Sequence, residues 1–493
     1  MMALRRLRRL AEGSSSCVLL RIRGLTRKTY ATEAVVAVGS NKGDRVGNIW
    51  RGLRALSMND GVEVLQYGSL YETAPAYYED QDDFLNSSVL LRTELEPVAL
   101  LDALKGIEKE SGRDLVGGIR YGPRTLDLDI VFYGGGEVDH ERLRVPHPRW
   151  KERSFVLAPL ADLEPGSAPS SESCGSRLVE ARRAWEDLGG EALVGGGEIR
   201  RVTPMGKRVV NFSGRSHIMG ILNATPDSFS DGGLYEAREK SVEQVRRMVS
   251  LGADIVDIGG QSTRPGADRV SSEEELGRIL PVIEAVRRDE ELSDVLVSVD
   301  TFYPRVAEEA VGAGADIVND VTAGGFDESM YDAVGKLGTP YVMMHMRGDP
   351  KTMQSEEKTA YGDLILEVAG ELSAKVHAAT RGGIMPWCII TDPGIGFAKT
   401  HSQNCEILGR TSELRRALSP GFARNAPMLV GPSRKGFLGT IVGKKDPRER
   451  DVATAAALVV ASLGECNIFR VHNVAVAADA LRVADALRAA GPL

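Results

Sequence analysis

Between residues 34 and 133 the hydrophobic positions switch repeatedly between the spacing of strands and that of helices. An apolar run at 34–40 predicts a strand, and runs near 62–71 and 84–91 predict two more. Helical intervals of three and four recur in Val46, Ile49, Trp50, Leu53 and Leu56, and again in Leu100, Leu101, Leu104 and Ile107. With a last strand at 126–132, the predicted order is β-α-β-β-α-β, that of a ferredoxin-like α+β sandwich.

The last of these strands carries two acidic residues on one face. Leu126 and Leu128 alternate with Asp127 and Asp129, so a half-buried strand directs both carboxylates to the same side, about 7 Å apart. Carboxylate oxygens are ligands that Mg²⁺ prefers, and Arg124 nearby suits a polyphosphate. The pattern therefore favours a magnesium site over the alternative, a solvated face of an ordinary strand.

From residue 217 onward eight short apolar runs alternate with helical patterns such as 241–251, 272–287 and 452–463. The runs are 217–225, 254–262, 295–301, 316–322, 341–346, 388–394, 428–433 and 468–473. Eight such units in sequence predict a closed (β/α)₈ TIM barrel. A stretch rich in Gly, Ser and Ala at 166–205 predicts a linker between the two patterned regions.

All eight runs end in polar or charged residues. They are Asn223, Gln261 to Arg264, Asp300, Asn319, Asp320, His345, Asp392, Ser433 to Lys435 and Arg470 to Asn473. Barrel enzymes work at the carboxyl ends of their strands, so these residues predict one ring-shaped site. Carboxylates and amides there suit a flat heterocycle rich in N–H donors, and the cations suit an anionic leaving group. The Gly and Pro residues of the loop 259–266 are explained equally well by a loop that closes over substrate and by ordinary turns.

Charge separates the beginning of the chain from the rest. Residues 1–30 hold eight basic residues and one acidic residue, leaving 53 basic and 68 acidic residues in the remainder, a net charge of −15. Because nucleic-acid-binding proteins are basic, neither a nucleic-acid nor a membrane partner is expected. The Arg- and Ser-rich start predicts an organelle transit peptide over 1–33, directed to the mitochondrion (matrix) rather than the plastid. A disordered basic tail is the alternative.

Longer motifs resemble two enzymes of folate biosynthesis. Residues 34–165 resemble 6-hydroxymethyl-7,8-dihydropterin pyrophosphokinase through VGSN, YETAP, DFLNS, GPRTLDLDI and VPHPR. The barrel region, with domain bounds at 206–493, resembles dihydropteroate synthase through GILNATPDSFSDGG, GGQSTRPGA, SVDT, VNDVTAG, DPGIGF, GPSRKGF and RVHNV. The resemblance implies a bifunctional enzyme that transfers pyrophosphate from ATP to hydroxymethyldihydropterin and then condenses the product with p-aminobenzoate to dihydropteroate, releasing pyrophosphate. No further catalytic domain is expected before residue 34.

In the kinase half the resemblance implies roles for ten residues. Asp127 and Asp129 would hold two Mg²⁺ ions that bridge ATP. The pterin would be held by Thr73, Asn86 and Phe155, and ATP by Glu108, Arg113, Arg124, His147 and Arg153. The two aspartates, Arg113 and Arg124 would be the catalytic set.

In the barrel half the resemblance assigns different residues of the predicted ring to different substrates. The pterin would be gripped by Asp300, Asn319, Asp392 and Lys435, of which the last two would be catalytic. The pyrophosphate would be held by Asn223, Arg264, Arg470 and His472, with Mg²⁺ near Asn223. Thr263 and Pro265 would border p-aminobenzoate. Synthases of this family are commonly dimers, which implies a homodimer or higher homo-oligomer formed through the barrel.

Two other functions compete with this interpretation. A pterin-binding barrel that transfers a methyl group to a corrinoid would share DPGIGF, but it would not need SRK, RVH or a fused kinase. A non-catalytic pterin-binding scaffold should have lost at least one of Asp127, Asp129, Asp300, Asp392 and Lys435. All five are present. The sequence departs from the usual kinase pattern at Tyr121 and Phe84, and Asn473 replaces an Asp often found in synthases.

Overall fold

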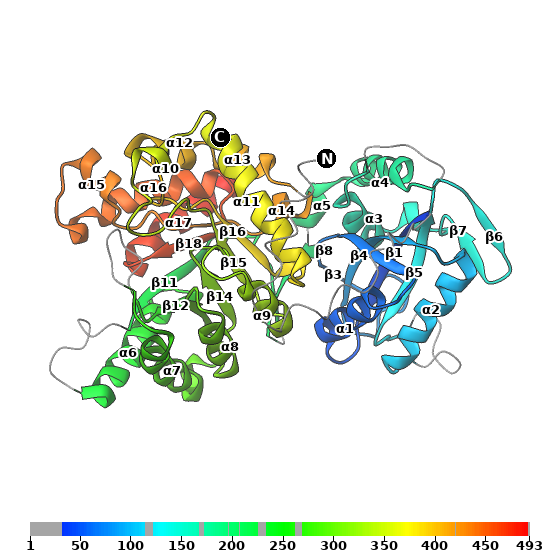
Figure 1. Ribbon diagram of the computed structural model, residues 1–493, viewed down its shortest axis with the longest axis horizontal. Helices are drawn as coiled ribbons and strands as arrows, with labels where there is room; N and C mark the ends of the chain where they lie inside the picture. The colour runs from blue at the N-terminus through cyan, green and yellow to red at the C-terminus, as the bar shows by residue number, and fades with distance from the viewer. Residues whose placement is uncertain are drawn as a thin grey trace, which may run out of the picture.

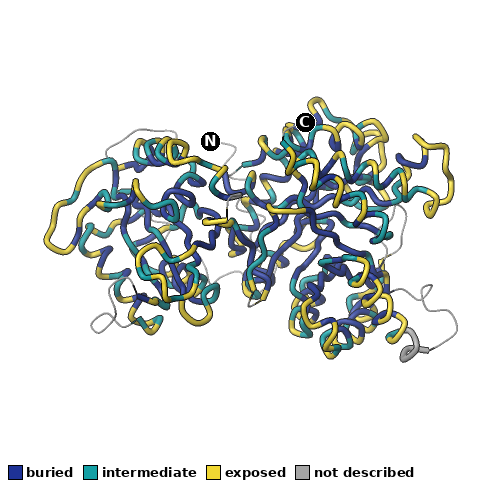
Figure 2. Tube along the Cα trace, turned by 180° about the vertical axis from the view of Figure 1, so that it is seen from behind, coloured by how far each residue is buried: buried dark blue, intermediate teal, exposed yellow. Residues whose placement is uncertain are grey.

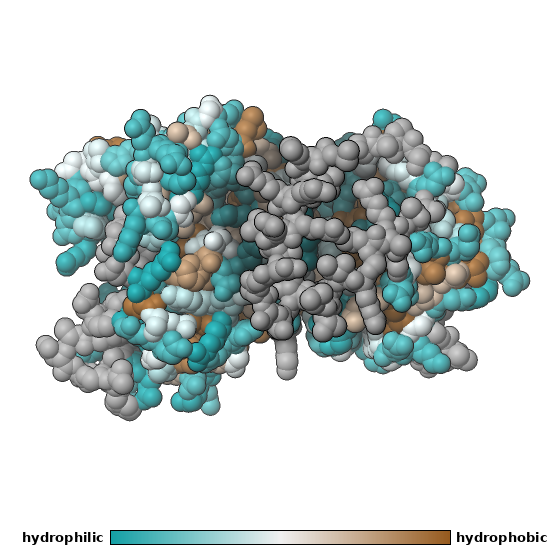
Figure 3. All heavy atoms as spheres, in the orientation of Figure 1, coloured by the Kyte–Doolittle hydropathy of each residue, from teal (hydrophilic) through white to brown (hydrophobic). Residues whose placement is uncertain are grey.

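Two units lie side by side along the long axis of the molecule (Figure 1). The structure, a computed structural model, describes residues 32–113, 122–166, 172–195, 197–206, 208–224, 233–261, 269–419 and 421–491. Within these ranges no helix is both long and apolar enough to span a bilayer. The face shown in Figure 3 is mainly hydrophilic where residues are described, and its hydrophobic patches are small and scattered.

The N-terminal unit is built on a sheet with the strand order β5-β1-β4-β3-β8, in which β2 also pairs with β4. The strands are β1 (Thr32–Ser40), β2 (Val62–Tyr67), β3 (Tyr71–Thr73), β4 (Phe84–Thr93), β5 (Asp127–Tyr133) and β8 (Ile199–Arg201). Helices α1 (Arg45–Ser57) and α2 (Pro97–Glu110) lie between them in the chain and bury the predicted apolar stripes. The strand order and the two helices confirm the ferredoxin-like α+β fold.

The sheet face opposite α1 and α2 is only partly covered. Helices α3 (Ser154–Ala161) and α4 (Gly175–Leu188) pack there in a second core that includes Val131 and Trp185. A bulge in β5 opposite Val35 and Val36 brings Phe132 into this second core, whereas strict alternation had placed it with Leu126. A small hairpin of β6 (Val138–His140) and β7 (Leu143–Val145) and a 3₁₀ turn (Trp150–Glu152) complete this part. The strand end that bears Asp127 stays uncovered.

Most of the predicted linker is folded against the N-terminal sheet. Its described residues form α4, α5 (Glu191–Gly195) and β8, and β8 pairs antiparallel with β3. Trp185 on α4 is 4% exposed, so this helix contributes to the core rather than serving as a flexible connection. A short helical piece is expected within 166–205, but its loose composition concealed the packing of that helix in the core and the edge strand β8. The chain then enters the barrel after Val202, whose backbone N–H donates to Leu70.

The C-terminal unit is an eight-stranded parallel barrel. Its strands are β11 (His217–Asn223), β12 (Ile255–Gly259), β13 (Leu296–Asp300), β14 (Ile317–Asp320), β15 (Tyr341–Met344), β16 (Ile389–Asp392), β17 (Leu429–Val430) and β18 (Ile468–Val471). The order β16-β15-β14-β13-β12-β11-β18-β17 is closed by a parallel bridge between Thr391 and Met428. All eight predicted runs became strands, which confirms the TIM barrel.

Helices surround the barrel, and a hairpin closes its floor. The helices are α6 (Gly233–Ser250), α7 (Ser272–Arg288), α8 (Pro304–Gly312), α9 (Ser329–Leu337), α10 (Glu356–Thr359), α11 (Leu364–Arg381), α12 (His401–Gly409), α13 (Thr411–Ala417), α14 (Gly421–Asn425), α15 (Gly436–Val442), α16 (Asp451–Leu463) and α17 (Val474–Ala489). Strands β9 (Thr203–Met205) and β10 (Arg208–Val210) form the hairpin, and Met205 joins the inner core with Phe212. Figure 2 shows buried chain through the interior of both units. The opposite, carboxyl ends of the strands are left for a site.

Two candidate active sites

The two aspartates of β5 occupy the open end of the N-terminal sheet. Leu126 and Leu128 are fully buried, whereas Asp127 and Asp129 are half-buried on the opposite face, as the alternation predicts. Farther along the same face, Val131 is covered by the second core. Because this cover stops before Asp129, the two carboxylates face a cavity of about 360 Å³.

Two arginines bind the carboxylate of Asp127. Nη1 of Arg113 lies 2.5 Å from Oδ1, and Nη1 of Arg124 contacts Oδ2. Burial raises the pKa of Asp127, but the charges of Arg124 and Arg113 outweigh burial and hold that pKa below its usual range. The carboxylate is therefore ionised at neutral pH. The two arginines predicted to bind phosphate already converge on the predicted metal ligand.

Glu108 lies beneath this cluster instead of in the cavity. It is fully buried, its Oε1 accepts the backbone N–H of Leu128 at 2.7 Å, and its Oε2 lies 2.7 Å from Nη1 of Arg113. Burial raises the pKa of Glu108. Lys105, which the sequence patterns did not single out, lies 2.7 Å from Glu108 and 3.5 Å from Asp129. Glu108 thus orients Arg113 from below.

The predicted pterin residues line the same cavity. Nδ2 of Asn86 donates to Oγ1 of Thr73 at 2.8 Å, and both residues are buried. The guanidinium of Arg153 lies 5.6 Å from the ring centroid of Phe155 and 5.5 Å from that of Tyr77. Nε of Arg153 also donates to the Tyr77 hydroxyl at 3.2 Å. Tyr77, absent from the predicted set, could have been noticed as an aromatic residue in the loop after YETAP.

His147 completes the cavity wall between the two groups of residues. Its backbone N–H donates to Val131, so it is fixed to the edge of the sheet. Burial lowers the pKa of His147, while the charge of Asp129 acts in the opposite direction. The ring is therefore mainly neutral at neutral pH. Of the predicted kinase residues, Glu108 and Arg113 lie outside the cavity lining, and all the others line it.

In the barrel, acidic and basic side chains meet above the strand ends. Nη2 of Arg470, from β18, lies 2.7 Å from Oδ2 of Asp300 on β13. Its Nε lies 2.6 Å from Oδ2 of Asp257 on β12, which also accepts Nδ2 of Asn319 at 3.1 Å. Burial raises the pKa of Asp300 to about 7, although Arg470 acts against that rise. These four residues form one hydrogen-bonded group.

Asp257 was missed because its surroundings in the sequence are apolar. It occupies the middle of β12, in IVDIG, and is fully buried. A single acid in an apolar strand is the only signal, and its partners are 62 and 213 residues away. A buried aspartate needs a paired cation or hydrogen bonds. Its presence therefore indicates a polar site, even though periodicity alone does not reveal one.

Asp392 and Lys435 form the other side of the barrel site. Oδ1 of Asp392 accepts the backbone N–H of Gly394 at 2.7 Å, and burial raises its pKa. Nζ of Lys435 donates to the backbone oxygen of Ile395 and lies 4.5 Å from the ring centroid of Phe397. Burial lowers the pKa of Lys435 to about 8, although Asp392 raises it. Lys435 is thus close to a change of charge near neutral pH.

A cavity of about 1040 Å³ opens above these groups. Of the predicted ring, Asn223, Asp300, Lys435, Arg470 and His472 line it, whereas Asn319 and Asp392 lie outside its lining. Oγ of Ser433 lies 2.9 Å from Nδ1 of His472 and also accepts its backbone N–H.

The loop after β12 and the residue after His472 also belong to the predicted site. Thr263, Arg264 and Pro265 lie outside the described residues. Nδ2 of Asn473, the departure noted above, donates to Oδ2 of Asp451 at 2.7 Å, and its side chain caps α17. Asn473 therefore has a structural use at the rim of the barrel.

Comparison with known proteins links both sites to families. The family model for 7,8-dihydro-6-hydroxymethylpterin-pyrophosphokinase (HPPK) matches residues 35–165, and that for pterin binding enzyme matches 219–472. The mitochondrial folate synthesis bifunctional protein of Arabidopsis thaliana is 49% identical over 92% of this chain and 83% of its own. The Pisum sativum protein of the same name is 48% identical over 93% of this chain and 90% of its own.

Solved structures agree with these matches. Dihydropteroate synthase of Xanthomonas albilineans with 4-aminobenzoic acid has a TM-score of 0.52 and 38% identity, covering 58% of this chain and 98% of its own. An HPPK-DHPS structure in complex with substrates has a TM-score of 0.69, covering 94% of this chain and 100% of its own. At 22% identity, the second match bears on the fold alone.

Proposed function

The chain belongs to the family of bifunctional folate synthesis proteins, and on that premise we propose how its two sites divide the work. Its N-terminal unit is the hydroxymethyldihydropterin pyrophosphokinase, and its barrel is the dihydropteroate synthase. The proposal concerns which residues carry each step, which ion takes part, how copies associate and where the protein acts.

Asp127 and Asp129 hold Mg²⁺ together with ATP. The donor set fits, because Mg²⁺ is usually bound by one or two carboxylates, substrate phosphates and water. Among the described residues no group of three or more His, Cys, Asp or Glu is arranged to hold a metal, which suits an ion that shares its ligands with a nucleotide. When bound, the ion neutralises charge on the transferring pyrophosphoryl group. Arg113 and Arg124 pair with Asp127 and offer their charge to the phosphates when ATP arrives.

The remaining cavity residues orient the two substrates. Thr73 and Asn86 offer a buried polar edge to the pterin, and Phe155 offers a flat face. Arg153, beside the ring of Phe155, and His147 bind ATP phosphates from the cavity wall, and Glu108 acts by holding Arg113 in place. Catalysis at this site then consists of positioning the pterin hydroxymethyl oxygen for attack and stabilising charge, without a covalent intermediate.

The barrel site grips the pterin by its polar edge and the pyrophosphate by its cations. Asp300 and Lys435 line the cavity, whereas Asn319 and Asp392 lie just outside its lining. On this proposal the oxygens of Asp300, Asn319 and Asp392 accept N–H donors of the ring, and Lys435 donates to it. Arg470 and His472, with Asn223 and Arg264, hold the pyrophosphate, and Asn223 is a ligand of a second Mg²⁺ site. Thr263 and Pro265 border p-aminobenzoate. The amine displaces pyrophosphate at the pterin methylene carbon, while Arg470 and His472 stabilise the charge on the departing group.

The observation that carries this division is the position of two separate polar clusters, each in its own cavity. Purified protein given hydroxymethyldihydropterin, ATP, Mg²⁺ and p-aminobenzoate is expected to form dihydropteroate. Omitting ATP should stop the formation of dihydropteroate, and supplying the pterin pyrophosphate should restore it. Chelating Mg²⁺ should stop the first step. Formation of dihydropteroate from the unactivated pterin without ATP would contradict the division.

Copies of the chain associate as a homodimer or higher oligomer through the barrel. Helix α16 is apolar on most sides, and Val452 and Val460 on it are 76% and 48% exposed. Val483 and Leu487 on the adjacent α17 are 58% and 40% exposed. Exposed apolar side chains gathered on neighbouring helices favour a partner surface. Light scattering of the wild type against Val452→Lys/Val483→Lys tests this, and an unchanged mass would refute it.

The protein acts in the mitochondrial matrix. The two relatives above carry the word mitochondrial in their names, and residues 1–33 have the Arg- and Ser-rich composition of a transit peptide. Fusing residues 1–33 to a fluorescent reporter should deliver the reporter to mitochondria. Reporter that remained in the cytosol or entered plastids would contradict this location.

A further inference from the structure

A buried lysine joins two loops at the barrel mouth, in the wall of the cavity described above. Lys399 ends the segment after β16 that we call the β16 loop (residues 394–399), and it is 2% exposed. Its Nζ donates to the backbone oxygen of Phe397 and to Nδ1 of His345, each at 3.0 Å. None of the roles proposed above involves this lysine. A buried ammonium is costly unless it is paired, so its position calls for a use.

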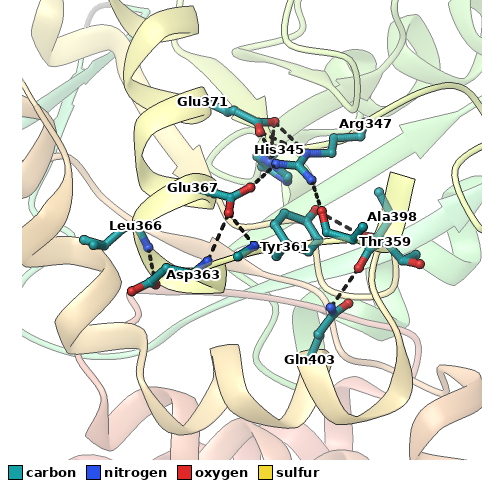
Figure 4. A network of polar contacts seen from close by, with 12 residues as sticks. His345, Arg347, Thr359, Tyr361, Asp363, Leu366, Glu367, Glu371, Ala398 and Gln403 are labelled. Carbon is teal, nitrogen blue, oxygen red and sulfur yellow. Dashed lines mark hydrogen bonds and ion pairs between the residues drawn. The ribbon is translucent and has the colours of Figure 1, made fainter. Parts of the chain in front are cut away.

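Behind Lys399 a chain of polar contacts extends to helix α11 (Figure 4). His345 is fully buried, and its Nε2 lies 3.1 Å from Oε2 of Glu371. Burial lowers the pKa of His345 to about 3, so the ring is neutral and its Nε2–H donates to Glu371 while Nδ1 accepts from Lys399. Arg347 holds Glu371 from the other side, with Nε 2.9 Å from Oε1. Lys399 is therefore tied to a rigid anchor.

Two further contacts hold the β16 loop from the same side. The hydroxyl of Tyr361 donates to the backbone oxygen of Ala398 at 3.0 Å, and Arg347 stacks 3.9 Å from the Tyr361 ring centroid. Nε2 of Gln354 donates to the oxygen of Gly396 at 3.1 Å. Ala398 has φ of 50°, a left-handed conformation that a residue with a side chain adopts only when its surroundings require it. The loop shape depends on these contacts.

The β16 loop is closely fitted around Lys435. Nζ of Lys435 donates to the oxygen of Ile395 and lies over the ring of Phe397. A Cβ added at Gly396 would lie only 2.7 Å from Cδ of Lys435, so loop and lysine are in tight contact. We propose that Lys399 is a positioning residue of the synthase reaction, which holds the β16 loop in the shape that aims Lys435 into the barrel cavity.

The charge of Lys399 gives this proposal a signature beyond packing. The charged groups facing Lys399 are Asp392, Lys435, Glu371 and Arg347, and Arg470 also faces Asp392. Burial lowers the pKa of Lys399 to about 7, so Lys399 carries its positive charge on the acid side of neutrality. There that charge partly opposes the rise that burial causes in the pKa of Asp392. Replacing the ammonium with a neutral group therefore raises the pKa of Asp392 further. The acid limb of the synthase pH profile should then move to higher pH.

The test compares Lys399→Met with Lys336→Met in the full-length chain. Lys336 lies on α9 with its side chain 63% exposed, paired with Asp332, and provides the same chemical change away from the site. Lys399→Met is expected to lower synthase kcat/KM by at least about tenfold and to shift the acid limb upward. Lys336→Met should change neither. Far-ultraviolet circular dichroism and thermal unfolding of each preparation report on folding of the barrel, and the pyrophosphokinase activity should stay at the wild-type value in both.

A second variant keeps the test decisive if Lys399→Met folds poorly. Tyr361→Phe removes only the hydroxyl that holds Ala398, and it should lower synthase kcat/KM by about two- to tenfold. The proposal is overturned if Lys399→Met folds and keeps the wild-type kcat/KM and acid limb. If Lys399→Met does not fold, the proposal is overturned when Tyr361→Phe keeps the wild-type synthase kcat/KM. Wild-type chain that fails to form dihydropteroate from supplied substrates would instead refute the proposed function.

Discussion

The two sites hold their key carboxylates in opposite states. Asp127 at the kinase site lies between two arginines, which keep its pKa below the usual range despite burial. Asp300 in the barrel also contacts an arginine, yet burial raises its pKa to about 7. The fixed negative charge at the kinase site fits the proposed binding of a cation and polyphosphate there. The barrel keeps a carboxylate near its titration point, which suits hydrogen bonding to a neutral ring.

The folds account for this difference. Asp127 lies on a sheet face that α3 and α4 cover only in part, so water and arginine side chains reach it from one side. Asp300 ends a strand enclosed by neighbours on both sides, and Asp257 is close enough to oppose its ionisation. An enclosed ring of strand ends therefore combines desolvation with like charge. Substitutions at the two sites and in the two units are expected to test this difference.

The largest effect is expected from Asp392→Ala. This variant removes the buried carboxylate that ends β16 and accepts the Gly394 N–H. Synthase kcat/KM should fall by about a thousandfold, while pyrophosphokinase activity stays unchanged. Separate assays of the two steps on one preparation measure both. Asp332→Ala removes an exposed carboxylate and should leave both steps intact, and parallel loss of both activities in Asp392→Ala would contradict the separation.

A large effect confined to the other unit is expected from Trp185→Ala. This side chain of α4 is 4% exposed in the second core, although it lies in the predicted linker. Truncation should destabilise the N-terminal unit by about 3 kcal/mol or more and lower the midpoint of its unfolding transition. Calorimetry with each activity followed on heating would detect this. A matched Leu188→Ala, at a 43% exposed position on the same helix, should cost far less.

The pH dependence should differ between the two steps. As pH falls through about 7, Asp300 gains a proton and its ion pair with Arg470 is lost, so synthase kcat/KM should decrease. Asp127 has a lowered pKa and stays ionised over the same interval, so the kinase should keep its activity. Profiles from about pH 5 to about pH 8 test the difference. Asp300→Asn should remove the contribution of Asp300 to the acid limb and leave that of Asp392, and an identical limb in both steps would contradict the assignment.

The smallest effect is expected at the contact between the units. Arg424 pairs with Glu164 at 2.7 Å, and both side chains are partly exposed, so the pair should contribute less than about 1 kcal/mol. Arg424→Ala should leave both activities unchanged in separate assays. Arg208→Ala, which removes an exposed pair with Asp294, is the matched control. A substantial loss of either activity only in Arg424→Ala would show that the two sites are coupled through this contact.

Local patterns predicted the architecture well. The eight apolar runs became the eight strands of the barrel, because each strand needs buried residues whatever its neighbours are. The polar ends of the runs also marked Asn223, Asp300, Lys435 and Arg470 correctly as lining one cavity. Alternation placed Asp127 and Asp129 on one face. These features are set by residues close together in the sequence.

Features that depend on distant partners were not predictable. Asp257 is a single acid in an apolar strand, and the sequence does not reveal that Arg470 lies beside it. Phe132 left the expected core because of a bulge against β1, and Glu108 turned inward to hold Arg113. Composition suggested a flexible linker, whereas β8 pairs with β3 across more than a hundred residues of chain. Long-range pairing of this kind leaves no periodic trace in the sequence.

The most direct test of the two-site account is a split assay of Asp127→Ala. The variant chain is given either hydroxymethyldihydropterin with ATP, or the pterin pyrophosphate alone, together with Mg²⁺ and p-aminobenzoate. We expect no dihydropteroate in the first mixture and the wild-type rate in the second, because Asp127 serves only the ATP-dependent step. Wild-type activity in the first mixture, or its loss in the second, would contradict the account.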